Sequence, residues 1–257
     1  MRYLIEFSYD GTKFHGFQRQ KDVKNVQSLL ENNLSLYFSK NILIKGSGRT
    51  DAGVHALGQC AHFDYEDIIT KRDIKNINTL LNNDIKIKKC HLVTDSFHAR
   101  YSVKNKTYYY LINNGKHKEK YEGYYYQIKR KLNYNKMKDA SKLFIGTHDF
   151  RNFVSGYRDD YISTIYSISF KKRRDLIKIT FVGKGFYRYM VRHLVGALVD
   201  VGKDKISKDV IREMLEKTDE FKSLSVAPAD GLYLKKINYE KKDKFTKNIW
   251  LFWLFFI

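Results

Sequence analysis

The sequence predicts an α+β fold built from two ferredoxin-like halves. Over residues 1–100, apolar residues alternate or recur at helical spacing in the order strand, helix, strand, strand, helix, strand. Residues 101–240 have a similar order of elements without visible sequence similarity to the first half. Mixed, mainly antiparallel sheets with helices packed on one side are typical of this class. A basic and then apolar tail, residues 241–257, has no assigned role.

In the first half, residues 2–9 alternate, with Tyr3, Ile5, Phe7 and Tyr9 on one face, which predicts a strand that ends at the turn signal Asp10-Gly11. Thr70 is the expected cap of a helix whose inner face carries Ile74, Ile77, Leu80 and Leu81. The remaining elements expected here are a helix over 25–38 and strands over 42–44, 57–65 and 85–94.

In the second half, the most apolar helix is predicted over 186–201, and Ser207 is expected to cap a helix that follows it. A third helix is expected over 135–146, ending at Gly146. The expected strands are 98–112, 124–129, 161–171, 175–183 and 231–239. No linker rich in proline, glycine or serine separates the halves, and Pro228 is the only proline.

The chain is strongly basic, with 48 Lys and Arg against 28 Asp and Glu and a net charge of +20. Such a surplus favours binding to the phosphates of RNA or DNA, although a generally lysine-rich composition would also produce it. The 20 tyrosines and 17 phenylalanines could stack on unpaired bases, while most belong to a core.

The two cysteines, Cys60 and Cys90, do not form a disulfide framework. A metal site is not expected, because Cys90 and the adjacent His91 would point to opposite faces of a strand. The N-terminus has no signal peptide, and the apolar run 249–257 is too short to span a bilayer. That run could be a packed strand, a subunit contact or an interfacial anchor.

The most informative segment is the glycine-rich run 46–55, which places the carboxylate of Asp51 on a tight loop of a very basic protein. Glycines allow positive φ and the close approach of another molecule. A carboxylate there could act as a nucleophile on a nucleic acid, and Arg49 could contact a phosphate or fill the space of a displaced base. Alternatively, Asp51 orders the turn through backbone N–H groups.

Two more side chains are candidates for chemistry. Tyr108 lies in a run of three tyrosines, where strand alternation places it on one face and Tyr109 on the other; such a run is also common in a core. Arg192 lies inside the most apolar helix, so its charge requires a carboxylate partner or must reach solvent. Asp51 is a candidate partner, and such a pair would favour the ionised acid.

Several separated motifs resemble the bacterial tRNA pseudouridine synthase A family from residue 2 to about 240. They are Tyr9–Gln20, Gly48–His55, Phe97–Arg100, Lys106–Tyr108, Phe186 with Met190–Arg192 and Val195–Gly196, Ala227–Ala229, and Gly231–Leu234. The sequence departs from the family pattern at Phe17, where tryptophan is frequent, and at Asn82-Asn83, where Pro-Gly is usual.

The resemblance implies two ferredoxin-like (RRM-like) halves, 1–100 and 101–240, whose sheets join around a central cleft. It implies a cytoplasmic homodimer, without cofactor or metal, that isomerises uridine to pseudouridine at positions 38, 39 and 40 of the tRNA anticodon stem-loop. By motif match the catalytic residues are Asp51, Tyr108 and Arg192, and the substrate-binding residues are Arg49, His55, Phe186 and Leu232. No membrane partner is expected.

Three other functions remain open from the sequence. The first is a synthase that acts on a different RNA, and the second is a non-catalytic tRNA-binding protein of the same fold. The third is a peripheral membrane protein that uses basic loops and the apolar tail. Intact Asp51, Tyr108 and Arg192 favour an enzyme, because a binding module would not need these three residues.

Overall fold

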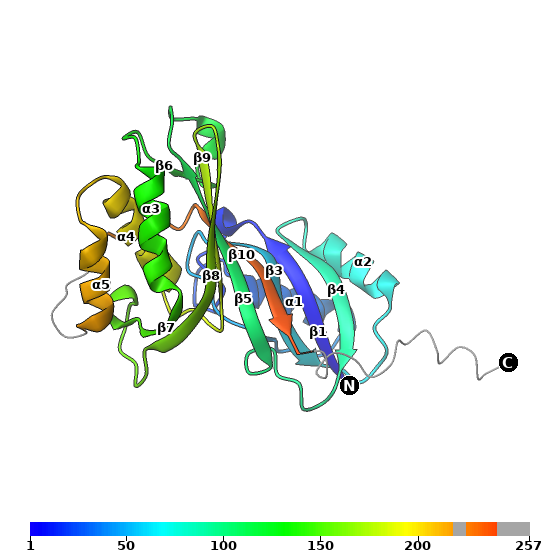
Figure 1. Cartoon of the computed structure of the whole chain (residues 1–257). Coiled ribbons are helices and arrows are strands. Elements are labelled where there is room, and N and C mark those ends of the chain that lie inside the picture. Colours follow the sequence, from blue (N-terminus) through cyan, green and yellow to red (C-terminus); the bar gives the residue numbers. More distant parts are fainter. Residues whose placement is uncertain (218–224, 241–257) are drawn as a thin grey trace.

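The computed structural model describes residues 1–217 and 225–240, so the predicted tail at 241–257 lies outside the described residues. In the described part of the chain, ten strands form one mixed sheet in the order β4-β1-β3-β10-β5-β9-β8-β7, with β2 paired to β3 and β6 to β5 (Figure 1). The strands are β1 (Arg2–Tyr9), β2 (Lys45–Gly46), β3 (His55–Asp64), β4 (Ile85–Val93), β5 (Val103–Asn113), β6 (Tyr126–Gln127), β7 (Gly146–Asp149), β8 (Ile162–Arg173), β9 (Leu176–Gly183) and β10 (Leu232–Tyr239).

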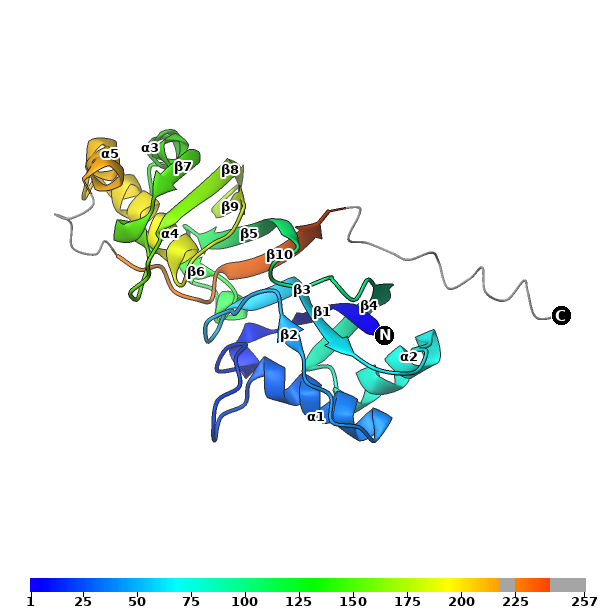
Figure 2. The same cartoon turned by 90° about the horizontal axis from the view of Figure 1, so that it is seen from below.

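Five α-helices accompany the sheet within the described residues, which confirms the predicted α+β class. Figures 1 and 2 show the first two helices beside β1, β3 and β4 and the other three beside β7, β8 and β9. They are α1 (Val26–Phe38), α2 (Lys71–Leu80), α3 (Tyr134–Ala140), α4 (Met190–Gly202) and α5 (Lys208–Glu216), with short 3-10 segments at Gly11–Lys13, Glu119–Tyr121, Ser141–Phe144 and Arg151–Phe153.

The C-terminal strand β10 joins the two parts of the sheet. It pairs in parallel with β3, where Tyr233 lies opposite His55, and antiparallel with β5, where Leu232 lies opposite Tyr110. Buried side chains divide into two clusters at this point: one gathers around β1 and α1, and the other around β5, β9 and α4. Tyr108 on β5 packs against both clusters, so it lies at the seam between them.

The predicted helix caps are confirmed. Thr70 forms a reciprocal capping box with Asp73 at the start of α2. The side chain of Ser207 accepts a hydrogen bond from the Asp209 N–H at the start of α5. Because these bonds satisfy N–H groups that have no partner within the helix, short polar side chains mark helix starts in the sequence.

Four predicted elements have other bounds in the structure. Segment 42–44 is not a strand, and β2 begins at Lys45. The strand expected from residue 98 begins at Val103, because residues 98–102 form a turn. The helix expected to reach Gly146 ends at Ala140 and continues as a 3-10 segment, and Gly146, with φ of 120°, begins β7.

The helix expected from residue 186 begins only at Met190. Its N-cap, Tyr189, has a φ of 60°, which is left-handed backbone that an α-helix cannot contain. The apolar residues before this point therefore belong to a connecting segment from β9. That segment carries Phe186 and Arg188 toward the first half of the protein.

Candidate active site

Hydrogen bonds on both sides of Arg49 hold the Asp51 loop, residues 46–55. The Gln59 side chain on β3 donates to the Gly48 carbonyl at 3.0 Å, and the Phe17 N–H donates to the Thr50 carbonyl at 3.0 Å. The hydroxyl groups of Thr50 and Tyr9 are also 2.8 Å apart. The loop is thus attached to β1, to β3 and to the segment that follows β1.

Two glycines outside the loop let the chain approach it closely. A Cβ atom at Gly11 would lie 2.4 Å from the carbonyl carbon and oxygen of Val54. A Cβ atom at Gly16, where φ is 92°, would lie 2.9 Å from the Thr50 carbonyl oxygen. The Tyr9–Gln20 motif therefore packs backbone against backbone beneath Asp51, which only glycine permits.

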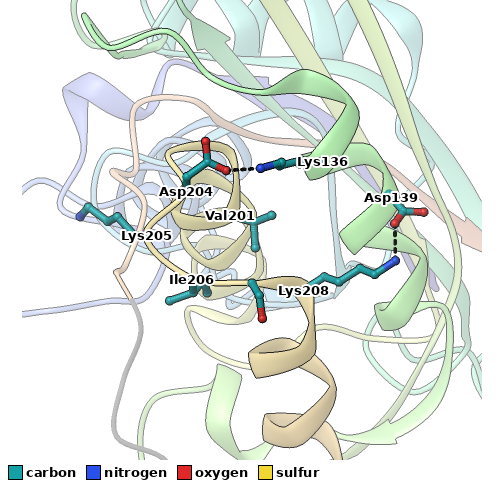
Figure 3. A pocket seen from close by; sticks show the side chains of 8 residues that line it. Lys136, Asp139, Val201, Asp204, Lys205, Ile206 and Lys208 are labelled. Atoms are coloured by element: carbon teal, nitrogen blue, oxygen red, sulfur yellow. Dashed lines mark hydrogen bonds and ion pairs between the residues drawn. The ribbon is translucent and has the colours of Figure 1, made fainter.

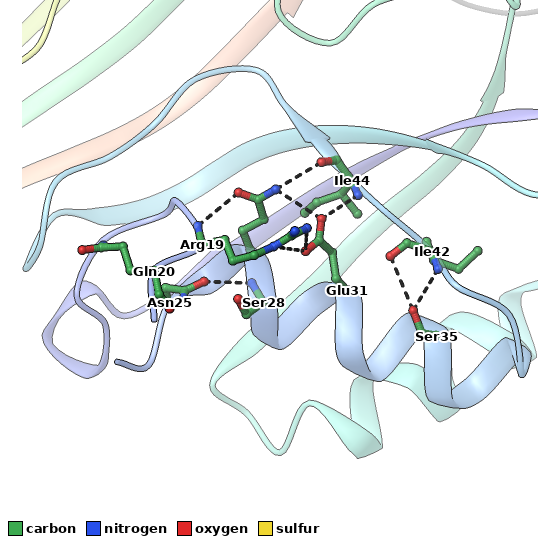
Figure 4. Close-up of polar contacts among 9 residues, drawn as sticks. Arg19, Gln20, Asn25, Ser28, Glu31, Ser35, Ile42 and Ile44 are labelled. Atoms are coloured by element: carbon green, nitrogen blue, oxygen red, sulfur yellow. Dashed lines mark hydrogen bonds and ion pairs between the residues drawn. The ribbon is translucent and has the colours of Figure 1, made fainter. Parts of the chain in front are cut away.

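The segment that leads into the loop is bonded to α1 through Glu31 (Figure 4). The buried Glu31 carboxylate accepts hydrogen bonds from the Ile44 N–H at 3.0 Å, from Gln27 Nε2 at 3.2 Å and from Arg19 Nε at 3.1 Å. Backbone N–H groups at 42 and 44 bond side chains of α1 instead of a neighbouring strand. This is why residues 42–44 are not a strand despite their apolar pattern.

Asp51 and Arg192 face each other, with Oδ2 and Nη1 4.0 Å apart and side-chain exposures of 24% and 17%. Arg192 Nε also donates to the Ala227 carbonyl at 2.7 Å, and its guanidinium lies 4.6 Å from the centre of the Tyr189 ring. Among the described residues, the Asp51 carboxylate accepts no backbone hydrogen bond. The side chain is therefore directed toward Arg192 and solvent, and does not order its own turn.

Two opposing effects act on the pKa of Asp51. Burial raises it, and the positive charges of Arg192 and then Arg188 lower it; the net direction is upward. The sequence predicted that a pairing arginine would favour the ionised acid, and this effect is present but smaller than that of burial. Arg188 was not identified from the sequence as a site residue. In the structure it precedes Tyr189, whose left-handed backbone marks this position as unusual.

Tyr108 and Phe186 form the aromatic part of the site. Their ring centres are 5.2 Å apart in an edge-to-face arrangement. Burial raises the pKa of the Tyr108 phenol, and the charges of Tyr9 and Asp51 raise it further, so the hydroxyl stays protonated at neutral pH. Phe186 lies over Gly183, where a Cβ atom would come within 2.9 Å of its ring.

The remaining predicted substrate-binding residues occupy different environments. Arg49 is exposed, and no hydrogen bond or ion pair joins its side chain to another residue of the described chain. Leu232 is buried at 5% exposure, so it supports β10 from within the core. His55 is also buried: its Nδ1 accepts from the Gly11 N–H at 3.1 Å, and its Nε2 lies 2.8 Å from the Gly123 carbonyl.

These contacts define His55 as a neutral ring with a proton on Nε2. Its Nδ1 also lies 3.3 Å from Asp10 Oδ1, but an Nδ1 that accepts the Gly11 N–H carries no proton for that carboxylate. The ring stacks on Tyr233 with ring centres 4.4 Å apart. The structure thus groups Asp51, Arg192, Tyr108 and Phe186, and places His55 and Leu232 in their support.

Lys106 is a further residue of the site that sequence reasoning did not single out. Its Nζ donates to the Ser47 carbonyl at 2.9 Å, directly below Gly48, where a Cβ atom would lie 2.7 Å away. Burial lowers the pKa of Lys106 to about 8. The Lys106–Tyr108 motif therefore supports the Asp51 loop with one side chain and forms the aromatic wall with another.

A hollow lies away from this site, between α3, α4 and α5 (Figure 3). Its lysines are already paired: Lys136 with Asp204 at 2.6 Å and Lys208 with Asp139 at 2.7 Å. The hollow therefore offers little free charge for a ligand. Elsewhere in the described residues, no group of three His, Cys, Asp or Glu could hold a metal ion, and no helix is long and apolar enough to cross a membrane.

A partly buried carboxylate, two arginines and a protonated tyrosine lie together at the seam of a strongly basic α+β protein, and this combination fits the class of enzymes that use a carboxylate on a nucleic-acid base. A family model described as tRNA pseudouridine synthase matches residues 6–102 and 140–240. The chain therefore belongs to the tRNA pseudouridine synthase family. The predicted family is confirmed. Membership of this family also confirms the predicted activity, an isomerase that forms pseudouridine in tRNA.

Individual relatives agree with this assignment. The chain is 39% identical to tRNA pseudouridine synthase A of Mycoplasma genitalium, with 93% of this chain and 99% of the relative covered. It is 41% identical to the protein of that name from Oceanobacillus iheyensis, covering 91% and 95%, and 39% identical to that of Bacillus subtilis, covering 93% and 100%. A solved Cbf5-Nop10-Gar1 complex matches with a TM-score of 0.35 and 10% identity, over 77% of this chain and 54% of that one, which adds nothing to the assignment.

Proposed function

We propose that this protein converts uridine to pseudouridine at positions 38, 39 and 40 in the anticodon stem-loop of tRNA. The observation that carries the proposal is Asp51, held on a glycine loop, facing Arg192 and adjoining Tyr108, inside a chain of the synthase family. In the reaction the bond from N1 to C1′ breaks, the uracil turns, and C5 bonds to C1′. C5 then loses its proton and N1 gains one, so the product is an isomer of the substrate.

Asp51 is the essential acid of the proposal, and it acts as the carboxylate. Attack at C1′, attack at C6 and elimination at C2′ all require its ionised form. Burial raises the pKa of Asp51, which would reduce the ionised fraction, while Arg192 and Arg188 lower it. The two arginines therefore favour the ionised form of Asp51. The negative charges of the RNA phosphates would act in the opposite direction and raise the pKa of Asp51.

The aromatic residues suit a base that has left the helix. Extruding a nucleotide costs a few kcal/mol, which stacking and phosphate contacts can offset. Tyr108 and Phe186 would hold the uracil ring while it turns, and the Tyr108 hydroxyl, protonated at neutral pH, could move a proton. Arg49, exposed and without a partner in the described chain, is proposed to occupy the space that the base leaves.

His55 and Leu232 are proposed to act as positioning residues. The His55 ring has both nitrogens engaged with the backbone, at Gly11 and Gly123, so it joins the first loop and the 116–125 segment to the end of the Asp51 loop. Leu232 lies opposite Tyr110 and supports the strand that carries Tyr108.

The organisation of the chain is part of the same proposal. Residues 1–100 and 101–240 would act as ferredoxin-like halves, with tRNA entering where they meet. The two buried clusters support this reading, although Leu234, Ile237 and Tyr239 of β10 pack into the first cluster and Val54 into the second. We propose a cytoplasmic homodimer that needs no cofactor. Sedimentation of the purified protein with and without tRNA would test the dimer.

The activity is tested with tRNA that carries tritium at C5 of uridine. The wild-type protein is expected to release tritium, and Asp51→Asn is expected to bind the tRNA and release none. Transcripts that keep uridine at only one of the three positions would assign the sites. Release by Asp51→Asn would remove Asp51 from the chemistry, and binding without release by the wild-type protein would favour a non-catalytic RNA-binding protein.

A further inference from the structure

The loop at residues 155–161 is joined to the segment that carries the site arginines. The Ser155 N–H donates to the Arg188 carbonyl at 3.1 Å, and the Ser155 hydroxyl lies 3.1 Å from His193 Nε2. Arg158 lies over the Tyr187 ring, 4.5 Å from its centre. The loop between β7 and β8 is thus attached on both sides of the start of α4, next to Arg192.

The tip of this loop presents an aromatic ring to solvent. Tyr157 is 91% exposed, more than any other large apolar or aromatic residue in the described chain. Internal bonds keep the loop closed: the Arg158 N–H donates to the Tyr161 hydroxyl at 2.9 Å, and that hydroxyl donates to the Gly156 carbonyl at 3.4 Å. Gly156 has a φ of 88°, so the turn before Tyr157 requires glycine.

Two arginines, one in this loop and one in the segment bonded to it, form no ion pair in the described chain. Arg158 and Arg188 each lie over a tyrosine ring, and neither forms an ion pair with a carboxylate of the described chain. An arginine held by an aromatic ring keeps its full charge, and its orientation is restricted before a ligand arrives. Arg158 directly follows Tyr157 in the chain, and an exposed ring with a neighbouring arginine can bind single-stranded RNA by stacking and phosphate contact.

We propose that the 155–161 loop is an RNA subsite, in which Tyr157 stacks on an unpaired base near the target uridine and Arg158 contacts the backbone phosphate beside it. This inference rests on the proposed function, because it places the RNA at the Asp51 site. The subsite would bind the strand whose target base is extruded, and so limit how that strand slides past Asp51.

The first test compares variants of Tyr157 on tRNA. Stacking on one base is worth about 1–3 kcal/mol, so Tyr157→Ala is expected to raise KM by roughly 5- to 150-fold, with a smaller effect on kcat. Tyr157→Trp, which keeps a stacking surface, is expected to restore most of the loss. Tyr166→Ala, which removes another tyrosine that is 50% exposed, is the matched control and should behave as wild type.

The second test locates the contact. With Asp51→Asn as the non-reacting protein, tRNA carrying 5-iodouridine at one unpaired loop position at a time is irradiated, and the cross-linked peptide is identified by mass spectrometry. A cross-link at Tyr157, lost in the double variant Asp51→Asn/Tyr157→Ala, is expected for at least one position. Cross-links confined to other peptides would overturn the subsite.

The third test concerns charge. Arg158→Gln is expected to reduce the slope of log Kd against log salt concentration by about one, which corresponds to the loss of one phosphate contact. Arg72→Gln is expected to leave this slope unchanged. Arg72 belongs to α2, which lies at the other end of the molecule from β7 and β8 (Figure 1). If wild type releases tritium but Tyr157→Ala and Arg158→Gln bind and react as it does, the subsite is wrong and the proposed function stands. If wild type releases none, the proposed function itself fails.

Discussion

The contact between Asp51 and Arg192 leads to a prediction whose size follows from its geometry. Two unit charges 4.0 Å apart interact by about 1 kcal/mol at the dielectric constant of water and by about 4 kcal/mol at an effective constant of 20. Both side chains are mostly but not fully buried, at 24% and 17% exposure. We therefore expect a coupling free energy between Asp51 and Arg192 that lies between these two limits. This coupling should exist in the folded protein and not in the unfolded chain.

A double-mutant cycle isolates this term. Arg192→Met, Asp51→Asn and the double variant are compared with wild type by urea denaturation, with equal slopes required of all four proteins. Arg192→Met should lose stability through both the ion pair and the bond to the Ala227 carbonyl, and Asp51→Asn in that background should recover about 1–4 kcal/mol relative to simple additivity.

Ionic strength provides an internal check on the cycle. Because the pair is partly exposed, the coupling should decrease between 0.05 M and 1 M sodium chloride, where the screening length falls to about 3 Å. A coupling below about 0.3 kcal/mol at low salt would refute the ion pair. A coupling free energy that does not change with salt concentration would mean that it arises from packing around Ala227 and not from the ion pair.

Three further predictions concern single side chains. Asp51→Asn should melt at or above the wild-type temperature. The folded pKa of Asp51 lies above its unfolded value, so ionisation of this carboxyl at neutral pH costs folding stability. A melting temperature of Asp51→Asn about 4 °C or more below that of wild type would contradict this. Glu31→Ala should lose about 2–4 kcal/mol in urea unfolding, since three donors lose their acceptor, whereas the exposed Glu216→Ala should change little. For Lys106, the folded pKa of about 8 lies below 10.5, the ordinary pKa of a lysine, so the unfolded state binds more protons in that window. Wild-type stability should accordingly gain up to about 3 kcal/mol between pH 8 and 10.5 relative to Lys106→Met, and parallel pH profiles would contradict a lowered pKa of Lys106.

Local rules were sufficient wherever the neighbours in sequence decide the structure. The capping threonine of α2 and the capping serine of α5 were predicted because each bonds an N–H group within its own first turn. The alternation of β1 placed Tyr3, Ile5 and Phe7 on the buried face, since the side-chain period of a strand is two. The same rules fail at Tyr189, where apolar spacing continues through a residue whose backbone is left-handed.

Residue types and order in the chain were enough to predict the α+β class, the family and the candidates Asp51, Tyr108 and Arg192. The apolar helix around Arg192 implied that its charge needs a partner, but not which one. Only the docking of the two halves through β10 brings Arg192 to Asp51, adds Arg188 as a second cation, and buries Lys106 under the loop. These contacts join segments far apart in the chain, and no local pattern encodes the distance between them or the balance of burial and charge that sets the pKa of Asp51.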